Sequence, residues 1–211
     1  MNNKIMIFTD GGSRDNGSNN ARASLGYRMK YKNHVKNGYL PIPNGTNNMA
    51  EIQAVTEGLK CLKKFNIPVE IYSDSAYTVN CCRDKWYSKW LVNGWNTSKK
   101  EPVLNQDRWK DLIEQIQKFE DITFYHLSGH VKLHLPAHVD KGYAKFLKNN
   151  PTKQHVTRNQ YIDLQLENHK SDLLTNIGMN ELDGRESENE KLWKLINSDL
   201  RKMLDEGLMK L

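Results

Sequence analysis

Long apolar runs are absent from this 211-residue sequence, in which 37% of the residues are hydrophobic. A helix that spans a bilayer needs about 20 mostly apolar residues in a row, so no membrane span is predicted. The first residues, MNNKIMIF, lead into a strand pattern and lack the apolar core and cleavage site of a secretory leader. We therefore expect a cytoplasmic protein with no membrane partner.

Cysteine is also scarce. The chain has three cysteines, two of them adjacent (Cys81 and Cys82), and this does not make a disulfide framework. An acidic excess is missing as well, because the net charge is +6. Residues 181–211 hold six basic and eight acidic residues, so the positive charge lies in residues 1–180. A basic body favours a polyanionic partner, although charge alone does not identify one.

The segment 4–12 combines an apolar run with a terminal acid and two glycines. Residues 5–8 are rich in β-formers and predict a buried strand. It would end at Asp10, and Gly11 and Gly12 would then allow a sharp turn. A buried charge is costly unless a metal or another partner stabilises it. The ordinary alternative is an Asp that initiates a turn.

Two elements are predicted before the next such strand. Alternating apolar residues over 23–39 indicate an antiparallel strand pair that turns near residue 32. Apolar residues at helical spacing predict a helix over 47–65, with Glu51 in its first turn. Small residues form a row along this helix: Ala50, Ala54 and Gly58. They would let it approach a sheet closely.

A second short strand, over residues 68–74, also ends in an acid, Asp74. Strands joined through a helix are usually parallel neighbours, which would bring Asp10 and Asp74 within reach of one ion. Adjacent carboxylates repel unless a divalent cation keeps both ionised. Oxygen ligands without a Cys or His cluster favour Mg²⁺ or Mn²⁺ over zinc.

Four segments together resemble the type 1 ribonuclease H family: Thr9–Gly12 (TDGG), Thr46–Glu51 (TNNMAE), Tyr72–Ser75 (YSDS) and His126–His130 (HLSGH). The resemblance covers residues 4–130 and resumes near residue 168. It implies an α/β ribonuclease H-like fold, with a mixed five-stranded sheet whose first three strands are antiparallel and which is flanked by helices. It also implies that Asp10, Glu51 and Asp74 bind metal.

The resemblance extends to substrate contacts. Asn16, Asn47 and Asn48 match family positions that touch an RNA–DNA hybrid, whereas Ala76 stands where many members carry a substrate-contacting Gln. Residues 83–110 resemble the family's basic handle, in which we expect these substrate contacts: Lys85, Trp86, Lys89, Lys99 and Lys100. Lysines mixed with aromatics suit a nucleic-acid backbone. The alternative is that the tryptophans only pack the handle against the body, which we expect for Trp109 and Trp90.

The fourth family carboxylate is ambiguous. The family places it about ten residues after a loop His, at a helix start, in an Asn-x-x-x-Asp pattern. Asp140 has that spacing from His130 but lacks the Asn, whereas Asp163 and Asp172 both have it. Apolar neighbours indicate that Asp163 lies within a packed element. We prefer Asp172, with Asp140 as the alternative.

The choice of Asp172 implies an insertion near residues 132–165, which includes a short basic helix over 141–148. His130, His134 and His138 recur every four residues, but Pro136 would break the helix that a zinc site on this spacing needs. His130 alone suits a loop base or a group that helps product release.

The C-terminal part reads as an extension of a catalytic domain over residues 1–180. Residues 181–190 form an acidic linker, and apolar residues recur on one helical face from 191 onward. That face could dock on its own domain, on a second copy or on a protein partner. A monomer is the expected state.

The expected function is cleavage of the RNA strand of an RNA–DNA hybrid by a two-metal mechanism, giving 5′-phosphate and 3′-hydroxyl ends. Two Mg²⁺ ions, with Mn²⁺ able to substitute, would be held by Asp10 between them, by Glu51 and Asp74 on one, and by Asp172 on the other. Two alternatives use the same fold: a non-catalytic module that binds hybrid or double-stranded RNA, and an assembly component.

Overall fold

The computed structural model describes residues 3–15, 18 and 20–211. Its five strands form one sheet, with the order β3-β2-β1-β4-β5. The strands are β1 (Ile5–Arg14), β2 (Arg22–Tyr31), β3 (His34–Pro43), β4 (Val69–Ser73) and β5 (Ile122–His126). The first three are antiparallel, and β4 and β5 run parallel to β1. The predicted mixed sheet is therefore confirmed.

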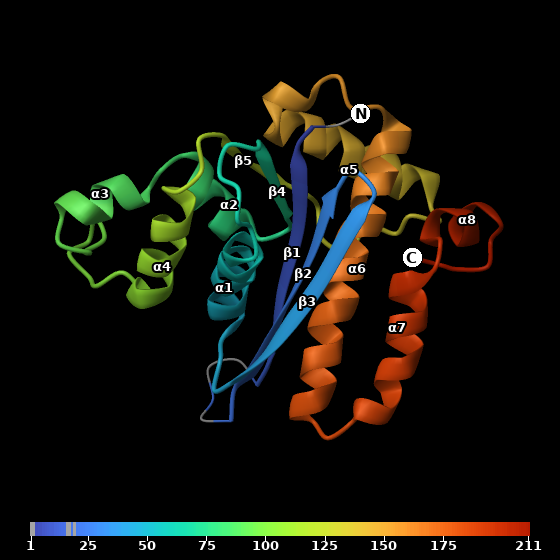
Figure 1. Cartoon of the computed structure of the whole chain (residues 1–211), viewed down its shortest axis with the longest axis horizontal. Helices are drawn as coiled ribbons and strands as arrows, with labels where there is room; N and C mark the ends of the chain where they lie inside the picture. Colours follow the sequence, from blue (N-terminus) through green and yellow to red (C-terminus); the bar gives the residue numbers. More distant parts are fainter. Residues whose placement is uncertain (1–2, 16–17, 19) are drawn as a thin grey trace.

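The helices surround this sheet (Figure 1). They are α1 (Asn47–Lys60), α2 (Ala76–Arg83), α3 (Tyr87–Val92), α4 (Gln106–Ile116), α5 (Pro136–Asn149), α6 (Arg158–Leu182), α7 (Asn189–Asn197) and α8 (Leu200–Asp205), with short 3₁₀ turns at η1 (Pro151–Lys153) and η2 (Glu186–Glu188). None of the helices in the described part of the chain is long and apolar enough to cross a membrane.

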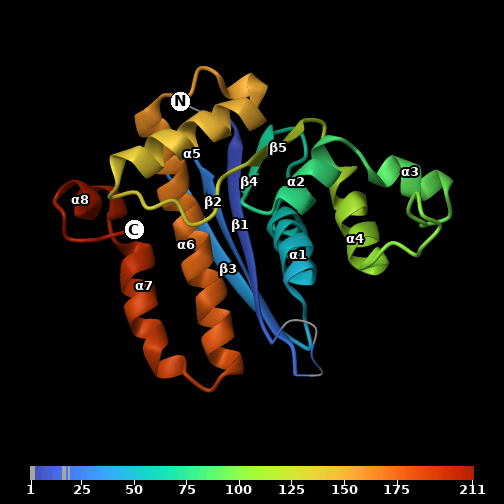
Figure 2. The same cartoon turned by 180° about the vertical axis from the view of Figure 1, so that it is seen from behind.

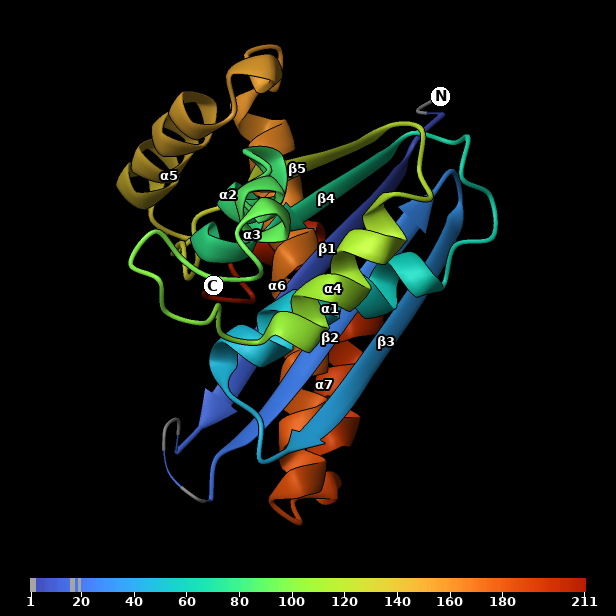
Figure 3. The ribbon, with the colours of Figure 1, turned by 90° about the vertical axis from the view of Figure 1, so that its left-hand side faces the viewer.

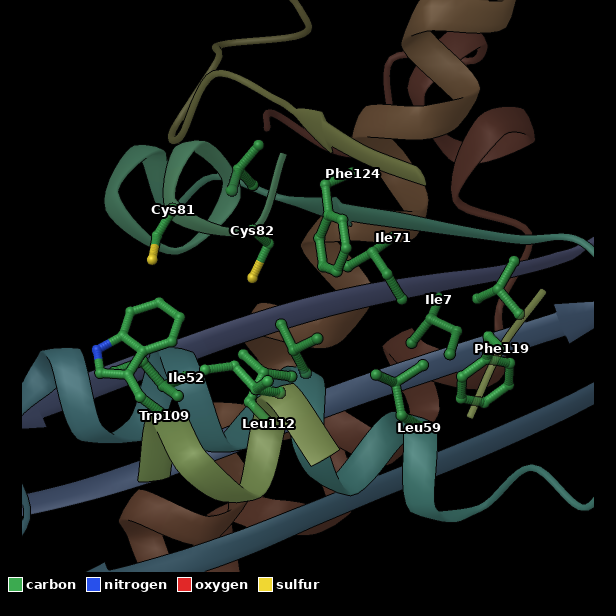
Figure 4. Packing of buried hydrophobic residues seen from close by; sticks show 14 of the residues in the cluster. Ile7, Ile52, Leu59, Ile71, Cys81, Cys82, Trp109, Leu112, Phe119 and Phe124 are labelled. Atoms are coloured by element: carbon green, nitrogen blue, oxygen red, sulfur yellow. The ribbon is translucent and has the colours of Figure 1, made fainter. Parts of the chain in front are cut away.

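One face of the sheet is covered by α1, α2 and α4. Ile7 and Ile71 project from β1 and β4 into a cluster with Ile52, Trp109 and other apolar side chains (Figure 4). The largest of these, Trp109, is fully buried. Cys81 and Cys82 contribute free thiols to the same cluster. This face is a continuous apolar core.

The opposite face is covered by α5 and α6, so the sheet lies between two helical layers (Figures 1 and 2). Aromatic rings line it: Phe8 stacks on Tyr72 with ring centroids 5.1 Å apart, and Tyr72 stacks on Tyr125 at 5.2 Å. Phe146 of α5 and Tyr161 of α6 close this second core.

The C-terminal helices pack on α6. Ile196 and Leu200 are buried there, at 1% and 2% exposure, so the apolar face of residues 191–204 docks on its own chain. The predicted single helix is wrong in one respect. The helix ends at Asn197, and a second helix, α8, begins at Leu200. The side chain of Asp199 caps α8 by accepting a hydrogen bond from the main-chain N–H of Lys202.

Three other boundaries differ from expectation. The first strand does not end at Asp10 but continues through Gly11 and Gly12 to Arg14. The helix predicted over 47–65 ends at Lys60. The last long helix does not begin near Asp172, because α6 starts at Arg158 with a capping box. Asp172 therefore lies inside a 25-residue helix.

Candidate active site

Two glycines let helices from both layers reach the backbone around Asp10. A Cβ on Gly11 would overlap the backbone of Glu51 in α1. Gly26 pairs with Asp10 across the β1–β2 ladder, and a Cβ there would overlap the carbonyl of Ser171 in α6. The glycine after Asp10 therefore permits a close helix approach, whereas we expected it to permit a turn.

Asp10 and Asp74 come together because β1 and β4 are parallel and pair in register up to Thr9 and Ser73. Each acid is the next residue along the chain: Asp10 still lies in β1, whereas Asp74 directly follows the end of β4. Burial, then the nearby Asp74 and Asp172, raise the pKa of Asp10 to about 8. Burial is also the main cause that raises the pKa of Asp74. A bound cation would remove much of this penalty.

Glu51 joins the same group from α1, where it is the fifth residue, so the prediction that it lies in the first turn is wrong. Glu51 is buried, with an exposed fraction of 6%. Burial, followed by Asp10 and Asp74, raises its pKa well above the ordinary value, while a hydrogen bond from Asn47 acts in the opposite direction. The carboxylates of Asp10, Glu51 and Asp74, which come from three separate segments of the chain, are thus close enough for the charge of one to affect the pKa of another.

The fourth carboxylate at this place is Asp172, which lines the same cleft as Asp10 and Asp74. Asp140 lies on α5, where it is exposed and forms an ion pair with Arg158 at 2.6 Å. Asp163 is also exposed and pairs with Arg201 at 3.0 Å. Of the three candidates, the structure brings only Asp172 to the other acids.

The cleft has a volume of about 300 Å³. It is lined by Asp10, Asp74, His130, Val131, Lys132, Leu133, Gln165, Asn168, His169, Asp172 and Leu211. His130 is exposed and has a φ of +51°, and its charge acts to lower the pKa of Asp74. Because Pro136 begins α5, the three histidines at four-residue intervals do not share one helix. His130 lines the same cleft as Asp10, Asp74 and Asp172.

Several residues of this cleft were not identified from the sequence. His169 lies one turn before Asp172 on α6, with its Nδ1 3.7 Å from Oδ2 of that acid. Burial lowers the pKa of His169. The spacing of three residues was the available signal, since such pairs share a helix face. Leu211 gives no such signal, because only the folded chain brings it beside the cleft.

The oxygen atoms around the cleft suit a hard cation. Glu51 Oε2, Asp74 Oδ1 and Asn168 Oδ1 are buried and have no hydrogen-bond partner within the described structure. Unpartnered buried oxygens need compensation, and carboxylate oxygens are ligands that Mg²⁺ and Mn²⁺ prefer. No three His, Cys, Asp or Glu side chains of residues 3–15, 18 and 20–211 converge on one metal position.

The predicted handle projects from the body as α3 and its flanking loops (Figures 1 and 2). Lys85, Lys89, Lys99 and Lys100 are exposed, and Trp86 is 38% exposed. Trp109 is buried, as expected for a packing residue. Trp90 packs edge-on against it with ring centroids 5.4 Å apart, which also agrees with the packing prediction.

The three predicted asparagine contacts have different surroundings. Asn48 is exposed at the start of α1, and Asn47 is half-buried beside Glu51. Both lie on α1, the helix that brings Glu51 near Asp10 and Asp74. Asn16 lies outside the described residues.

Comparison with known proteins gives a consistent result. The RNase H family model matches residues 2–142. The chain is 38% identical over 127 residues to ribonuclease H of Clostridium botulinum, a match that covers 60% of this chain and 84% of the relative. It is 35% identical over 150 residues to ribonuclease H of Prosthecochloris aestuarii, covering 71% and 99%.

Solved structures agree with the fold. The solution structure of the PFV RNase H domain matches with a TM-score of 0.52 and 28% identity, over 72% of this chain and 95% of that domain. The crystal structure of LC9-RNase H1, described as a type 1 RNase H, matches with a TM-score of 0.54 and 16% identity, over 71% and 75%. The chain belongs to the type 1 ribonuclease H family of enzymes.

Proposed function

We propose that this enzyme cleaves the RNA strand of RNA–DNA hybrids and leaves 5′-phosphate and 3′-hydroxyl ends. The observation that carries the proposal is the meeting of Asp10, Asp74 and Asp172 at one cleft, with Glu51 electrostatically coupled to the first two. Relatives that share 35–38% identity are named ribonuclease H. A binding module that only retained the fold would have no need for four acids at one place.

The four carboxylates would share the work of holding the metal. Asp10 lies at the centre, where α1, β4 and α6 meet β1, and would contact both ions. Glu51 and Asp74 would hold one ion and Asp172 the other. Two Mg²⁺ ions, with Mn²⁺ able to substitute, would activate the attacking water and stabilise the leaving 3′-oxygen.

Residues around the acids would handle protons and substrate. His130 lies at the exposed rim of the cleft, where an imidazole can take up or release a proton near neutral pH. Asn16, Asn47 and Asn48 would contact the hybrid, in which the 2′-hydroxyl distinguishes RNA from DNA. Lys85, Trp86, Lys89, Lys99 and Lys100 would hold the duplex along the handle. In this division residues 1–180 are the catalytic domain and residues 181–211 an extension.

The test is cleavage of an end-labelled RNA–DNA hybrid with Mg²⁺ by the wild type and by Asp10→Asn, Asp172→Asn and Asp140→Asn variants. We expect more than about a 100-fold loss for the first two, because even residues that only support a metal ligand typically cost 10- to 100-fold. Asp140→Asn is the matched control and should cleave like the wild type.

Two results would contradict the proposal. A wild type that binds the hybrid but never cuts it, with Mg²⁺ or Mn²⁺, would make the chain a binding module. Inactive Asp140→Asn together with active Asp172→Asn would reverse the assignment of the fourth carboxylate. Product ends are read separately, by the ability of the downstream RNA fragment to be ligated through its 5′-phosphate.

A further inference from the structure

The segment between the His130 loop and α6 is strongly basic. Residues 131–157 contain five lysines and one acid, Asp140. Lys153 is buried and paired with Glu70 at 2.7 Å. The other four lysines are exposed and form no ion pair with a described residue: Lys132, Lys141, Lys145 and Lys148. Lysines that lie close together without acidic partners create a local positive potential.

Three of these lysines form a stripe along α5. Lys141, Lys145 and Lys148 are spaced by four and three residues, so they share one side of the helix. Val139, Gly142 and Phe146 on the other side are buried against the body. The stripe therefore points away from the core into solvent.

The end of α5 that follows Lys148 is linked to Asp74 through His126. In the tautomer with its proton on Nε2, this imidazole donates to the carbonyl oxygen of Asp74 at 3.2 Å, and Asn149 of α5 donates to its Nδ1 at 3.3 Å. The end of α5 is therefore separated from the backbone of Asp74 by a single side chain, that of His126.

Arg83 connects this surface to the handle. Its guanidinium donates to the carbonyl oxygen of Asn149 at 3.1 Å, which joins the end of α2 to the end of α5. From the handle side, α5 lies beside α2 (Figure 3). From behind, α5 lies in front of the sheet, directly above the segment 127–135 that carries His130 (Figure 2).

The helix is also fixed in place. Asn150 at its end accepts from the main-chain N–H of His126 at 3.1 Å and donates to its carbonyl oxygen at 3.0 Å. Lys153 anchors the next turn under the sheet, with its ammonium 4.2 Å from the ring centroid of Tyr125. A preorganised row of charges loses less entropy on binding than a flexible one.

From these observations we infer that Lys141, Lys145 and Lys148 contact the phosphodiester backbone of the nucleic-acid duplex beyond the cleft, an inference that rests on the proposed function. The duplex would then be held on two sides of the catalytic acids, by the handle and by α5. The partner chemistry is a run of phosphates, since lysine ammonium groups supply point charges without base-specific contacts.

The test measures binding of a 20-base-pair RNA–DNA hybrid by fluorescence anisotropy between 50 and 200 mM NaCl, in the Asp10→Asn background so that no cutting occurs. The α5 variant changes Lys141, Lys145 and Lys148 to Gln. We expect binding to weaken at least about 10-fold at 100 mM NaCl. The slope of log affinity against log salt should fall by about 2–3, since each phosphate contact contributes about 0.9.

A matched control changes three exposed lysines of α7 and its neighbourhood, Lys191, Lys194 and Lys202, to Gln. It removes the same charge and should change the affinity less than about twofold. Changing the α5 lysines to Arg keeps the charge and should restore binding. Circular dichroism verifies that each variant is folded.

The inference would be overturned if the α5 variant bound the hybrid as tightly as Asp10→Asn with its α5 lysines intact. It would also be overturned if the α7 control lost as much affinity as the α5 variant, because the loss would then reflect the net charge and not the position of the lysines. Both results leave the proposed cleavage intact if the unmutated enzyme cuts the hybrid. Failure of the unmutated enzyme to cut or bind the hybrid would instead remove the proposed function.

Discussion

The side chains that pack on the two faces of the sheet differ in their chemistry. The face under α1 and α4 is closed by uncharged side chains: aliphatic groups, the two thiols, the rings of Phe119 and Phe124, and the buried indole of Trp109. The face under α5 and α6 contains stacked aromatic rings and buried charges. On that second face Glu70 accepts bonds from Lys153 at 2.7 Å, from Lys4 at 2.6 Å and from Tyr72 at 2.8 Å.

The difference follows from what each face has to hold. The first face joins elements of residues 5–124, and non-directional apolar packing is sufficient there. The second face fastens late segments of the chain, including η1 and α6, in one position over the acids. Ion pairs such as Lys30 with Glu167, whose charged atoms are 2.6 Å apart, fix such a position because the charged groups interact well only in a few relative positions. The cleft that contains Asp10, Asp74 and Asp172 is lined by α6, one of the helices of this second face.

The largest stability effect should come from the apolar face. Trp109→Ala removes a fully buried indole and should lower the free energy of unfolding by about 3–5 kcal/mol. Urea denaturation measures it. Trp86→Ala, at a half-exposed position of the handle, should cost less than about 1 kcal/mol. Similar losses in both variants would contradict the assignment of Trp109 as the packing residue.

The next effect concerns the charged face. Glu70→Gln leaves the ammonium of Lys153 buried without its partner and should cost about 3 kcal/mol at pH 7. The double variant Glu70→Gln with Lys153→Met removes the orphaned charge and should recover part of this loss. If the double variant is no more stable than Glu70→Gln, the pair does not act as a unit.

The same pair predicts a pH dependence. Burial raises the pKa of Glu70, but the bonds from Lys153, Lys4 and Tyr72 outweigh it, and the pKa lies below its ordinary value. A lowered carboxyl pKa stabilises the fold above the unfolded value of about 4.3 and loses that effect as the pH falls through the folded value. The stability gap between wild type and Glu70→Gln should therefore shrink below roughly pH 4. A constant gap in urea denaturation at pH 7 and pH 3 would contradict this.

The sequence predicted the first face better than the second for a physical reason. Strand and helix periodicity located β1, α1 and β4, and their parallel register brought Asp10 and Asp74 together as expected. Asp-Gly-Gly was misread, because glycine serves a turn and a close helix approach equally well. Only the packing of α1 on Gly11 distinguishes the two.

The second face depends on pairs far apart in the sequence, and local patterns do not contain them. Lys153 and Glu70 are 83 residues apart, and nothing near either one indicates the other. The first turns of α6 were assigned to the insertion, which displaced the predicted helix start to Asp172. The choice of Asp172 over Asp140 nevertheless followed from a short pattern, because Asn168 and Asp172 share a helix face.

A smaller effect should come from the C-terminal helices. Leu200→Ala empties a buried position between α8 and the second core and should cost about 2–3 kcal/mol in urea denaturation. The exposed Leu208→Ala is its control and should stay within about 0.5 kcal/mol. No loss in Leu200→Ala would mean that α8 does not stabilise the charged face in solution.

The smallest effect concerns the loop that carries His130. His134 donates its main-chain N–H and its ring Nδ1–H to the carbonyl oxygen of Leu211, at 3.2 and 2.6 Å. His134→Ala removes the ring bond, and because the site is exposed the cost should be about 0.5–1 kcal/mol. Local opening is more sensitive than global stability, so hydrogen exchange of residues 130–135 should speed up while the rest of the chain is unchanged. The exposed His138→Ala on α5 is the control, and equal exchange in both variants would mean that the tail does not hold this loop.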